Sequence, residues 1–589
     1  MKKTIAFMLA LCAVATTFAG KVSETRARQV ARNFWLMETK SDPQLRDITS
    51  RVGLTDVYLF DVDGGKGYIV VAGDDIAYPV LAYSTNNGFA TGNIAPAVMY
   101  MLRNYEHHIA YTRELGEGAV PEVEKEWSNL ENGRPMERKS STAVAQLMTS
   151  TWSQDEPYND MCPQAEGQDR CVTGCVATAM AQVMRYWKYP EHGVGEHWYT
   201  YDDRPAAVTH MVGDSNAVWP YDTLKADYEN TYYDWDNMPD NATAASSEEE
   251  KAAVATLLFH CGVAVDMVYT PSGSGAFMTR QEVLNFDPVN YSTEIAAEVV
   301  IPQYFGYSEN TKGILKNDYT TLEWVALLKS EISNGRPIIF AGNDPGSDYG
   351  HAFVLDGYNA YLYFHCNFGW GGQYDGDFRV AEIAPARSGH AFTDKQCGIF
   401  YMYPPGMGFY GVDVECHGEG GSVYDGETAV CDSTLKVSLD EGGLQLKIVA
   451  DEGYTINKIL ADKDTIYVNN APFGQHDITC TAGNEPRTVV CDLTNRKNDV
   501  KLKAFFANQS LSIDATGDIA RNQTKVFAIG SNIEIRGPKI GTVEVYDAIG
   551  RLITTHNGQG TDQASIAVQQ RGLYVVRIAN HPYKVIIRN

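Results

Sequence analysis

The sequence lacks two features that would indicate large classes of protein. Its 589 residues contain no long run of Lys and Arg, so nothing supplies the basic face that a nucleic-acid-binding protein needs. Beyond the N-terminal segment there is no stretch of about 18 consecutive apolar residues, which a membrane-spanning helix requires. Acidic residues outnumber basic ones by 74 to 48, giving a net charge of −26. We therefore expect no nucleic-acid partner and no membrane span.

The first 20 residues have the pattern of a secretory signal peptide. "MKKTIAFMLALCAVATTFAGK" combines a basic start, an apolar centre and small residues, with cleavage expected around Ala19 or Gly20. Export makes disulfides possible. Of the 11 cysteines, two pairs lie close together in sequence, Cys162 with Cys171 and Cys480 with Cys491. The sequence leaves their pairing open.

The length predicts several domains, and changes of pattern suggest their boundaries. Residues 21–139 open with a helix over 23–38 and continue with strands, and a polar stretch at 116–143 is predicted to be a linker that holds the basic pair Arg138-Lys139. A mixed α and β domain follows. Short alternating strands and glycine turns then predict two β-sandwich modules. The mixed domain covers 140–403, and the modules cover 404–508 and 509–589.

Cys175 stands at the start of a predicted helix. In "CVTGCVATAMAQVMRYWKYP" the apolar residues recur with the period of one helical face, Thr173 is a plausible N-cap and Pro190 ends the pattern. In a first turn, free N–H groups and the helix dipole stabilise a thiolate. A nucleophile is therefore one interpretation of Cys175. A buried core cysteine and half of a disulfide remain the alternatives.

A thiolate nucleophile needs a histidine, and His351 is the best placed of the 13 in the sequence. It begins the alternating strand "HAFVLDGY" after Gly350. A two-residue turn at Asn359-Ala360 would set His351 opposite Phe368 and direct Asn367 to the other face, unless a bulge intervenes. This register favours a Cys-His dyad with an aromatic neighbour. His192 and His197 lack a third ligand, so no metal or other cofactor is predicted.

The remaining requirement is a donor to the oxyanion. Gln154, in "TWSQDEPYN", is one of many polar residues that could supply it together with the Cys175 backbone N–H.

Four separated motifs resemble the streptopain family of secreted cysteine peptidases, peptidase family C10, which is papain-like in fold. They are "TWSQDEPYN", "CVTGCVATAMAQVMRYWKYP", "GHAFVLDGY" and "NFGWGG". The resemblance covers about 140–403. It implies Cys175 as nucleophile, His351 as general base and acid, and Gln154 in the oxyanion hole. The histidine is then expected to be oriented by, or to lie against, Asn367, Phe368 and Trp370, although the family usually has Trp where Phe368 stands.

Both ends of the chain carry further resemblances. Residues 21–110, through "GYIVVAGDDIAYPVLAYS", are similar to the inhibitory propeptide of that family. The C-terminal segments "VEVYDAIGRLI", "GLYVVRI" and "KVIIRN" resemble the sorting domain of the type IX secretion system of Bacteroidetes. The implied fold class is therefore multidomain, with an α+β papain-like catalytic domain, an α+β prodomain before it and β-sandwich modules after it.

Together these resemblances imply a secreted cysteine endopeptidase made as a zymogen. It would hydrolyse protein or peptide substrates through a Cys-His dyad and a thioester acyl-enzyme, with hydrophobic residues preferred before the scissile bond. Its own propeptide and a bacterial export machinery would be its partners, and a monomer in the medium or on the surface of a Gram-negative bacterium is expected. One alternative is a surface adhesin on a peptidase scaffold with little activity, against which the intact set of Gln154, Cys175 and His351 argues. Another is an enzyme of a different reaction with the same dyad, such as a transglutaminase or amidase.

Overall fold

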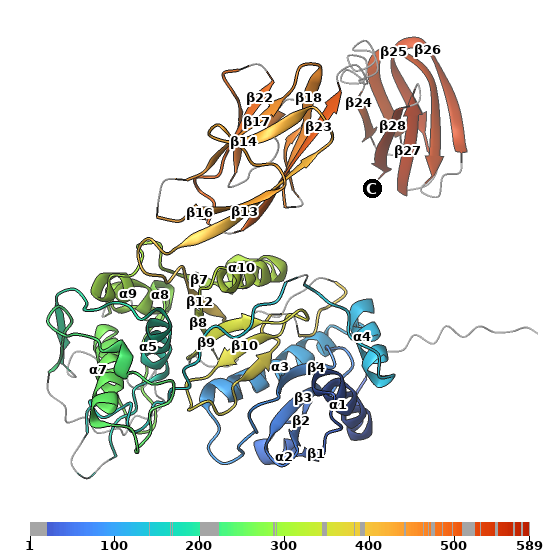
Figure 1. The fold of residues 1–589 in the computed structure, drawn as a ribbon. Coiled ribbons are helices and arrows are strands. Elements are labelled where there is room, and N and C mark those ends of the chain that lie inside the picture. Colours follow the sequence, from blue (N-terminus) through green and yellow to red (C-terminus); the bar gives the residue numbers. More distant parts are fainter. Residues whose placement is uncertain are drawn as a thin grey trace, which may run out of the picture. The chain divides into compact units, whose positions relative to one another are not determined.

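The computed structural model forms two compact units. The first holds residues up to 412 together with 436–443 and 496–499, and the second holds the rest (Figure 1). The predicted signal peptide lies almost wholly outside the described residues. The structure describes residues 20–587 except 141, 165–166, 168, 201–222, 287–288, 290, 344–349, 382, 389–394, 441–442, 463, 469–470, 473–477, 486, 498, 509–524, 530–531, 548–551, 569–571 and 579–580.

The N-terminal part of the first unit is a helix-covered sheet. Helix α1 begins after Ser23, whose side chain accepts a hydrogen bond from the Arg26 N–H, as expected of an N-cap. Its buried residues are Ala27, Val30, Ala31, Phe34 and Trp35, so the predicted helix and its apolar face are confirmed. The predicted strands are also present. In chain order the elements are α1 (Glu24–Thr39), β1 (Leu45–Asp47), α2 (Thr49–Val52), β2 (Val57–Val62), β3 (Gly67–Ala72), β4 (Val80–Ser84) and α3 (Pro96–Glu114).

The predicted linker at 116–143 is wrong over much of its length. Helix α4 (Pro121–Glu131) occupies its centre and buries Val123, Trp127 and Leu130. These residues follow helical spacing within a stretch whose overall composition is polar. The Trp127 indole N–H donates to the Ala77 carbonyl at 2.8 Å. The chain connection between the two parts of the unit is therefore limited to the residues that follow α4.

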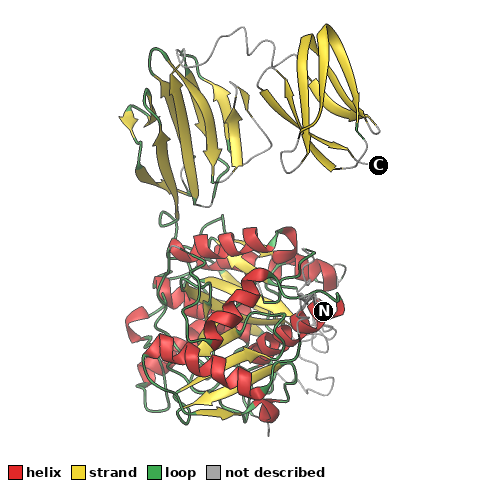
Figure 2. Cartoon of the chain, turned by 90° about the vertical axis from the view of Figure 1, so that its right-hand side faces the viewer, coloured by secondary structure: helices red, strands yellow, loops and turns green. Residues whose placement is uncertain are grey.

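The C-terminal part of the first unit, from about residue 144, packs helices on a sheet (Figure 2). Side chains of β8 and β9 alternate between two cores. Phe340 and Phe353 lie in one core, and Ala352 and Val354 lie in the other, with helix α5. The helices are α5 (Cys175–Trp187), α7 (Glu248–Ala264), α8 (Arg280–Phe286), α9 (Ala297–Phe305) and α10 (Thr321–Ser333), and the strands are β5 (Glu196–Tyr199), β6 (Leu224–Asp227), β7 (Lys312–Leu315), β8 (Ile338–Asn343), β9 (Gly350–Tyr358), β10 (Phe364–Asn367), β11 (Gly376–Phe378) and β12 (Cys397–Phe400).

One continuous sheet joins the two parts of this unit. Its ten strands run in the order β1-β2-β3-β4-β11-β10-β9-β8-β12-β7. The joint is the antiparallel pair β4–β11, in which Asp377 pairs with Tyr83 and Phe378 with Ala82. The N-terminal part thus adds its strands directly to the sheet that carries His351.

After residue 409, every described element is a strand. Two sheets of six and five strands cover 409–508, and another five-stranded sheet covers the described residues from 525. The strands are β13 (Phe409–His417), β14 (Gly421–Asp425), β15 (Thr428–Ala429), β16 (Ser433–Ser438), β17 (Gln445–Ala450), β18 (Tyr454–Ala461), β19 (Asp464–Val468), β20 (Ala471–Pro472), β21 (Thr479–Ala482), β22 (Thr488–Asp492), β23 (Val500–Asn508), β24 (Lys525–Ile529), β25 (Asn532–Asp547), β26 (Leu552–Ala567), β27 (Gly572–Ile578) and β28 (His581–Ile587).

Two pairs of cysteines lie close together in the C-terminal strands. Cys416 and Cys431 form a disulfide, which the sequence did not single out. Cys480 and Cys491 pair across β21 and β22 as free thiols with their sulfurs 2.9 Å apart.

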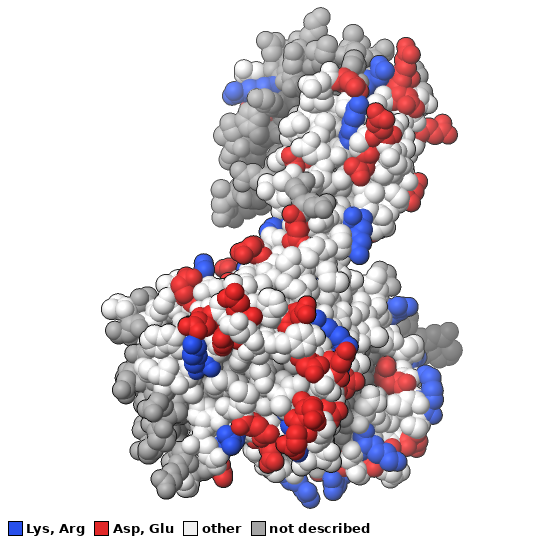
Figure 3. Space-filling model, turned by 60° about the vertical axis from the view of Figure 1, so that its left-hand side comes forward, with Lys and Arg blue, Asp and Glu red and all other residues white. Residues whose placement is uncertain are grey.

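Acidic side chains gather in patches on the face drawn in Figure 3. None of the helices in the described part of the chain is long and apolar enough to cross a membrane.

Candidate active site

Helix α5 places Cys175 at its first position. The N-cap is Gly174 and not the predicted Thr173, whose hydroxyl lies 2.8 Å from that of Thr178. Gly174 has a φ of 87°, and a Cβ there would lie 2.7 Å from the Met267 sulfur. Only glycine fits this backbone and this close contact. The small residue before Cys175 is therefore a condition for the helix to start where it does.

The thiol of Cys175 faces the start of β9. The Ala352 N–H donates to the Cys175 sulfur at 3.5 Å, and Ala352 directly follows His351. Cys175 and His351 both line a cavity of about 770 Å³, and Gln154 lines it as well. The structure thus brings the three predicted residues to one cleft.

The surroundings of the thiol determine its proton affinity. Burial raises the pKa of Cys175, whereas the N–H groups of Ala352 and Val176 lower it. Because burial outweighs the hydrogen bonds, the pKa lies above its ordinary value, and the thiol form is favoured in this arrangement. The helix start alone therefore does not produce a thiolate here.

Gln154 is held on the loop that precedes α5. The Thr173 N–H donates to the Gln154 backbone carbonyl at 3.1 Å, which ties the loop to the residues just before Cys175. The side chain is half-buried and borders the cleft. An amide at this place can donate to an oxyanion that forms beside the thiol.

The predicted register of the β9–β10 hairpin is wrong. Asn367 pairs with Val354, and a bulge lies between His365 and Cys366. The connection spans residues 359–363 instead of two residues, because the Asn359 N–H donates to the Tyr363 carbonyl at 3.0 Å. Consequently Phe368 does not lie opposite His351.

The three residues expected near the histidine lie in two different environments. Phe368 and Trp370 line the cleft, and the Phe368 ring lies 5.1 Å from that of Phe353. Asn367 is buried and forms a reciprocal amide pair with Gln182, at 3.0 and 3.2 Å, and also donates to the Ser150 carbonyl. The described contacts of Asn367 thus go to Gln182, Ser150 and the Gly369 N–H, and none goes to His351.

Sequence reasoning missed Gln182. It is fully buried within α5, and its carbonyl oxygen also accepts from the Ser150 hydroxyl and the Trp152 N–H. This side chain therefore ties α5 to both β10 and the segment before Gln154. A glutamine on an otherwise apolar and alanine-rich helix face was the available signal, because a buried amide requires partners.

The N-terminal part of the unit also reaches the cleft. The cavity that Cys175 and His351 line is also lined by Pro96 and Ala97, at the start of α3, and by Asn93 just before it. Gly342 pairs with His351, and a Cβ on it would lie 2.0 Å from the Tyr100 hydroxyl of α3. Helix α3 therefore packs directly against the strand beside the histidine.

Comparisons with known proteins cover both parts of this unit. A model of the Peptidase C10 family matches residues 152–378, and a model of the Spi protease inhibitor matches residues 19–109. A solved fragment of prointerpain A from Prevotella intermedia is 32% identical, covering 61% of this chain and 99% of the fragment, with a TM-score of 0.46. The chain belongs to the Peptidase C10 family. Its expected cysteine-peptidase class and inhibitor-like N-terminal region are confirmed at this level.

Other relatives of this C10 peptidase extend the comparison. Active interpain A of Prevotella intermedia is 36% identical over 45% of this chain and 97% of the solved chain, with a TM-score of 0.36. The thiol protease/hemagglutinin PrtT of Porphyromonas gingivalis is 28% identical over 64% of this chain but only 40% of its own length. Streptopain of Streptococcus pyogenes is 27% identical over 57% of this chain and 76% of its own length.

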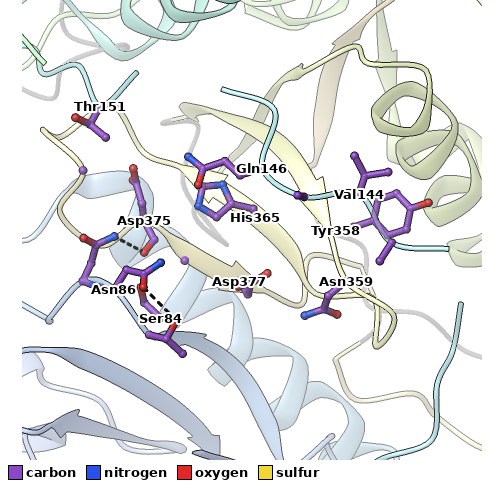
Figure 4. Close-up of a pocket in the computed structure, with 16 residues that line it drawn as sticks. Ser84, Asn86, Val144, Gln146, Thr151, Tyr358, Asn359, His365, Asp375 and Asp377 are labelled. Atoms are coloured by element: carbon purple, nitrogen blue, oxygen red, sulfur yellow. Dashed lines mark hydrogen bonds between the residues drawn. The ribbon is translucent and has the colours of Figure 1, made fainter. Parts of the chain in front are cut away.

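A second cavity of the C10 peptidase lies at the joint between the two parts of the sheet. It measures about 570 Å³ and is lined by Ser84, His365, Asp375 and Asp377, among others (Figure 4). Burial alone would lower the pKa of His365, but its 2.6 Å hydrogen bond to the buried Asp356 and the charge of that residue raise it to about 9. Burial raises the pKa of Asp375 to about 7 and that of Asp377 to about 6, although the charge of His365 acts in the opposite direction.

Among the residues that the structure describes, no group of three or more His, Cys, Asp and Glu could hold a metal ion.

Proposed function

We propose that this chain is an exported cysteine endopeptidase made as a zymogen, with the papain-like catalytic arrangement that its sequence motifs resemble. The observation that carries the proposal is the Cys175 sulfur held 3.5 Å from the Ala352 N–H. It brings a helix-start thiol beside the residue that follows His351, in a cleft that Gln154 also lines.

The proposed reaction has two stages. His351 takes the proton of Cys175, the thiolate attacks the peptide carbonyl, and the oxyanion is stabilised by the Gln154 amide and the Cys175 backbone N–H. The C–N bond then breaks, and His351 gives its proton to the leaving amine, which leaves a thioester on Cys175. Water, deprotonated by His351, hydrolyses that thioester and restores the thiol.

The N-terminal region is proposed to inhibit this reaction until it is removed. Two contacts support this role, namely the start of α3 at the cleft and the pairing of β4 with β11. The exposed Arg138, in the connection after α4, is a suitable site for cleavage. The proposed domains remain 21–139 as propeptide, 140–403 as peptidase, 404–508 as a β-sandwich module and 509–589 as a sorting domain.

Peptide hydrolysis with and without a thiol blocker tests the enzyme. The full-length chain should activate itself, cleave labelled peptides and lose this activity after treatment with E-64. Cys175→Ala should remain folded, accumulate as precursor and show no hydrolysis. Activity in purified Cys175→Ala would refute the assignment, as would binding to host surfaces without any E-64-sensitive hydrolysis, which the adhesin alternative predicts.

Two further measurements test the ends of the chain. N-terminal sequencing of the active form should begin near residue 140, and a start near Lys21 would refute removal of the propeptide. Deleting residues 509–589 should retain the active enzyme in the periplasm of its Gram-negative host. Normal external activity from the truncated strain would refute the sorting role and leave the peptidase proposal unaffected.

A further inference from the structure

A carboxyl group that the proposed mechanism does not use lies in the cleft. Glu282, on α8, lines the same cavity as Cys175 and His351, and so does Cys397 on β12. The Cys397 thiol donates to Glu282 Oε1 at 3.5 Å. Both residues line the cavity and meet through these two atoms, so the carboxyl group lies between two residues of the cavity wall.

One oxygen of this carboxyl group is fixed and the other is almost unused. The N–H groups of Met278 and Thr279 donate to Oε2 at 2.6 and 3.1 Å. Among the described residues, Oε1 has only the weak thiol donor of Cys397, although a carboxylate accepts about four hydrogen bonds. Within the described part of the chain, no Lys, Arg or His forms an ion pair with Glu282. Its position is therefore set by the backbone, and its acceptor capacity is left for another group.

The neighbouring Glu298 shows how a structural carboxylate differs. Its Oε1 accepts from the Arg280 N–H at 2.6 Å, and its Oε2 accepts from the Gly313 N–H at 2.7 Å. Both oxygens of Glu298 are engaged with backbone, and Glu298 is not among the residues that line the cleft. Contacts with the backbone thus account for both oxygens of Glu298. In Glu282 the described backbone contacts account for Oε2 but not for Oε1.

The wall of this cavity combines apolar and polar side chains. Phe277, Leu315 and Ala341 line it, and so do Gln281, Asn285 and Lys395. Burial raises the pKa of Glu282, and the charge of Glu298 adds to this effect. A carboxyl group in such a place costs free energy unless a ligand supplies its counter-charge or donors.

We infer that Glu282 forms an acidic subsite that takes an Arg or Lys side chain of the peptide substrate. The inference rests on the proposed peptidase function. The aliphatic part of the basic side chain would lie along the apolar side chains of the lining, and its charged end would donate to Oε1. This differs from the purely hydrophobic preference that the family resemblance implies.

Matched peptides test this subsite in the self-activated full-length chain. Fluorogenic peptides would carry Arg or Met at each position flanking the scissile bond in turn. A charge-assisted hydrogen bond predicts that kcat/KM is about tenfold or more higher for Arg at one position. Glu282→Gln should bring this ratio close to one, and Glu282→Leu should favour Met.

Two controls separate Glu282 from other acids. Glu298→Gln should keep the Arg preference, since Glu298 lies outside the cleft lining. Asp155 also lines the cleft, and Asp155→Asn should keep the preference as well. A wild-type ratio near one, or a preference that Asp155→Asn removes and Glu282→Gln does not, would overturn the acidic subsite while the peptidase function stands.

A second readout does not depend on hydrolysis. The rate at which iodoacetamide alkylates Cys175, followed by mass spectrometry of that peptide, should be slowed more by the Arg peptide than by the Met peptide, and Glu282→Gln should remove the difference. If no peptide is hydrolysed but this protection is seen, the proposed function fails and the subsite remains. Equal protection by both peptides would overturn the subsite.

Discussion

Two cavities of the first unit each contain a histidine, but the two histidines have different partners. In the larger cavity, His351 shares the lining with the Cys175 thiol and the Gln154 side chain. In the smaller cavity, His365 is hydrogen-bonded to the buried Asp356 at 2.6 Å, with Asp375 and Asp377 nearby (Figure 4). The two residues lie on the adjacent strands β9 and β10.

The partner of His365 limits what this histidine can do. A pKa of about 9 keeps His365 protonated at neutral pH, so it cannot accept a proton as a general base. It can neutralise buried carboxylates instead. The polar lining of the smaller cavity is thus suited to hold strands together, whereas proton transfer is the role proposed for His351 in the cleft.

The largest expected effect is the difference in activity between variants of the two histidines. His351→Ala should reduce hydrolysis to background, because removing the base of such a unit costs on the order of 10⁴ or more in rate. His365→Gln should keep most of the activity. The measurement is kcat/KM on one peptide, after both variants have been processed in trans by wild-type enzyme that is then removed. Comparable losses in the two variants would remove the functional distinction between the cavities.

The next effect concerns the two glutamines. Gln154→Ala should lower kcat by about 10²–10³-fold, the usual cost of one lost oxyanion donor. Gln146 lines the smaller cavity and provides the matched control, since Gln146→Ala should change kcat little. Steady-state kinetics with both variants decides, and an unchanged kcat in Gln154→Ala would contradict the assigned role.

A third effect is the pH dependence of stability. The folded-state pKa of His365, about 9, lies above the ordinary value near 6.5. Its stabilisation is therefore fully present below about pH 6.5 and is lost as the pH rises through 9, up to about 3 kcal/mol in all. The raised pKa values of Asp375 and Asp377 act in the same direction, over a lower range from about pH 4 to 7.

Denaturant unfolding of the Cys175→Ala precursor between pH 6 and 10 measures this effect. His365→Gln should lower the free energy of unfolding at pH 6 and have little effect at pH 10. A difference between the two proteins that does not change with pH would show that His365 acts through packing alone.

The smallest effect concerns the thiol of the cleft. Because burial raises the pKa of Cys175, removal of the propeptide should hydrate the thiol and lower its pKa. One pKa unit corresponds to about a tenfold rise in thiolate at neutral pH. Alkylation of Cys175 at pH 7 should therefore accelerate by about that factor after processing. Cys397, in the same cleft, is fully buried and serves as the slow control.

Local sequence patterns predicted the elements that carry the site, but they could not predict the contacts between residues far apart in the chain. The spacing of apolar residues predicted α1 and the helix that begins at Cys175. The hairpin register failed because the Asn359 side chain accepts from the N–H groups of Tyr361 and Tyr363 and stabilises a longer connection. The Asn359-Ala360 pair does not reveal this.

The missed polar residues share one property. Gln182 and Asp356 have partners on neighbouring elements, so their roles depend on packing that a single sequence does not encode locally. Glu282 was missed for a similar reason, since it reaches the cleft only through the place where α8 packs beside β12. A buried polar residue in an apolar segment was the only signal for Gln182 and Asp356.

The pairing of β4 with β11 also determines how activation depends on dilution. While the chain is uncut, the tether holds the two strands at an effective concentration on the order of millimolar. Cutting the connection after α4 leaves the strand pair intact but makes its reassociation bimolecular. On the proposed zymogen function, a cleaved propeptide would therefore release the cleft only when the total protein concentration falls below the dissociation constant of the pair. On the proposed export, the nicked protein would stay closed at high concentration, and dilution in the medium would complete its activation.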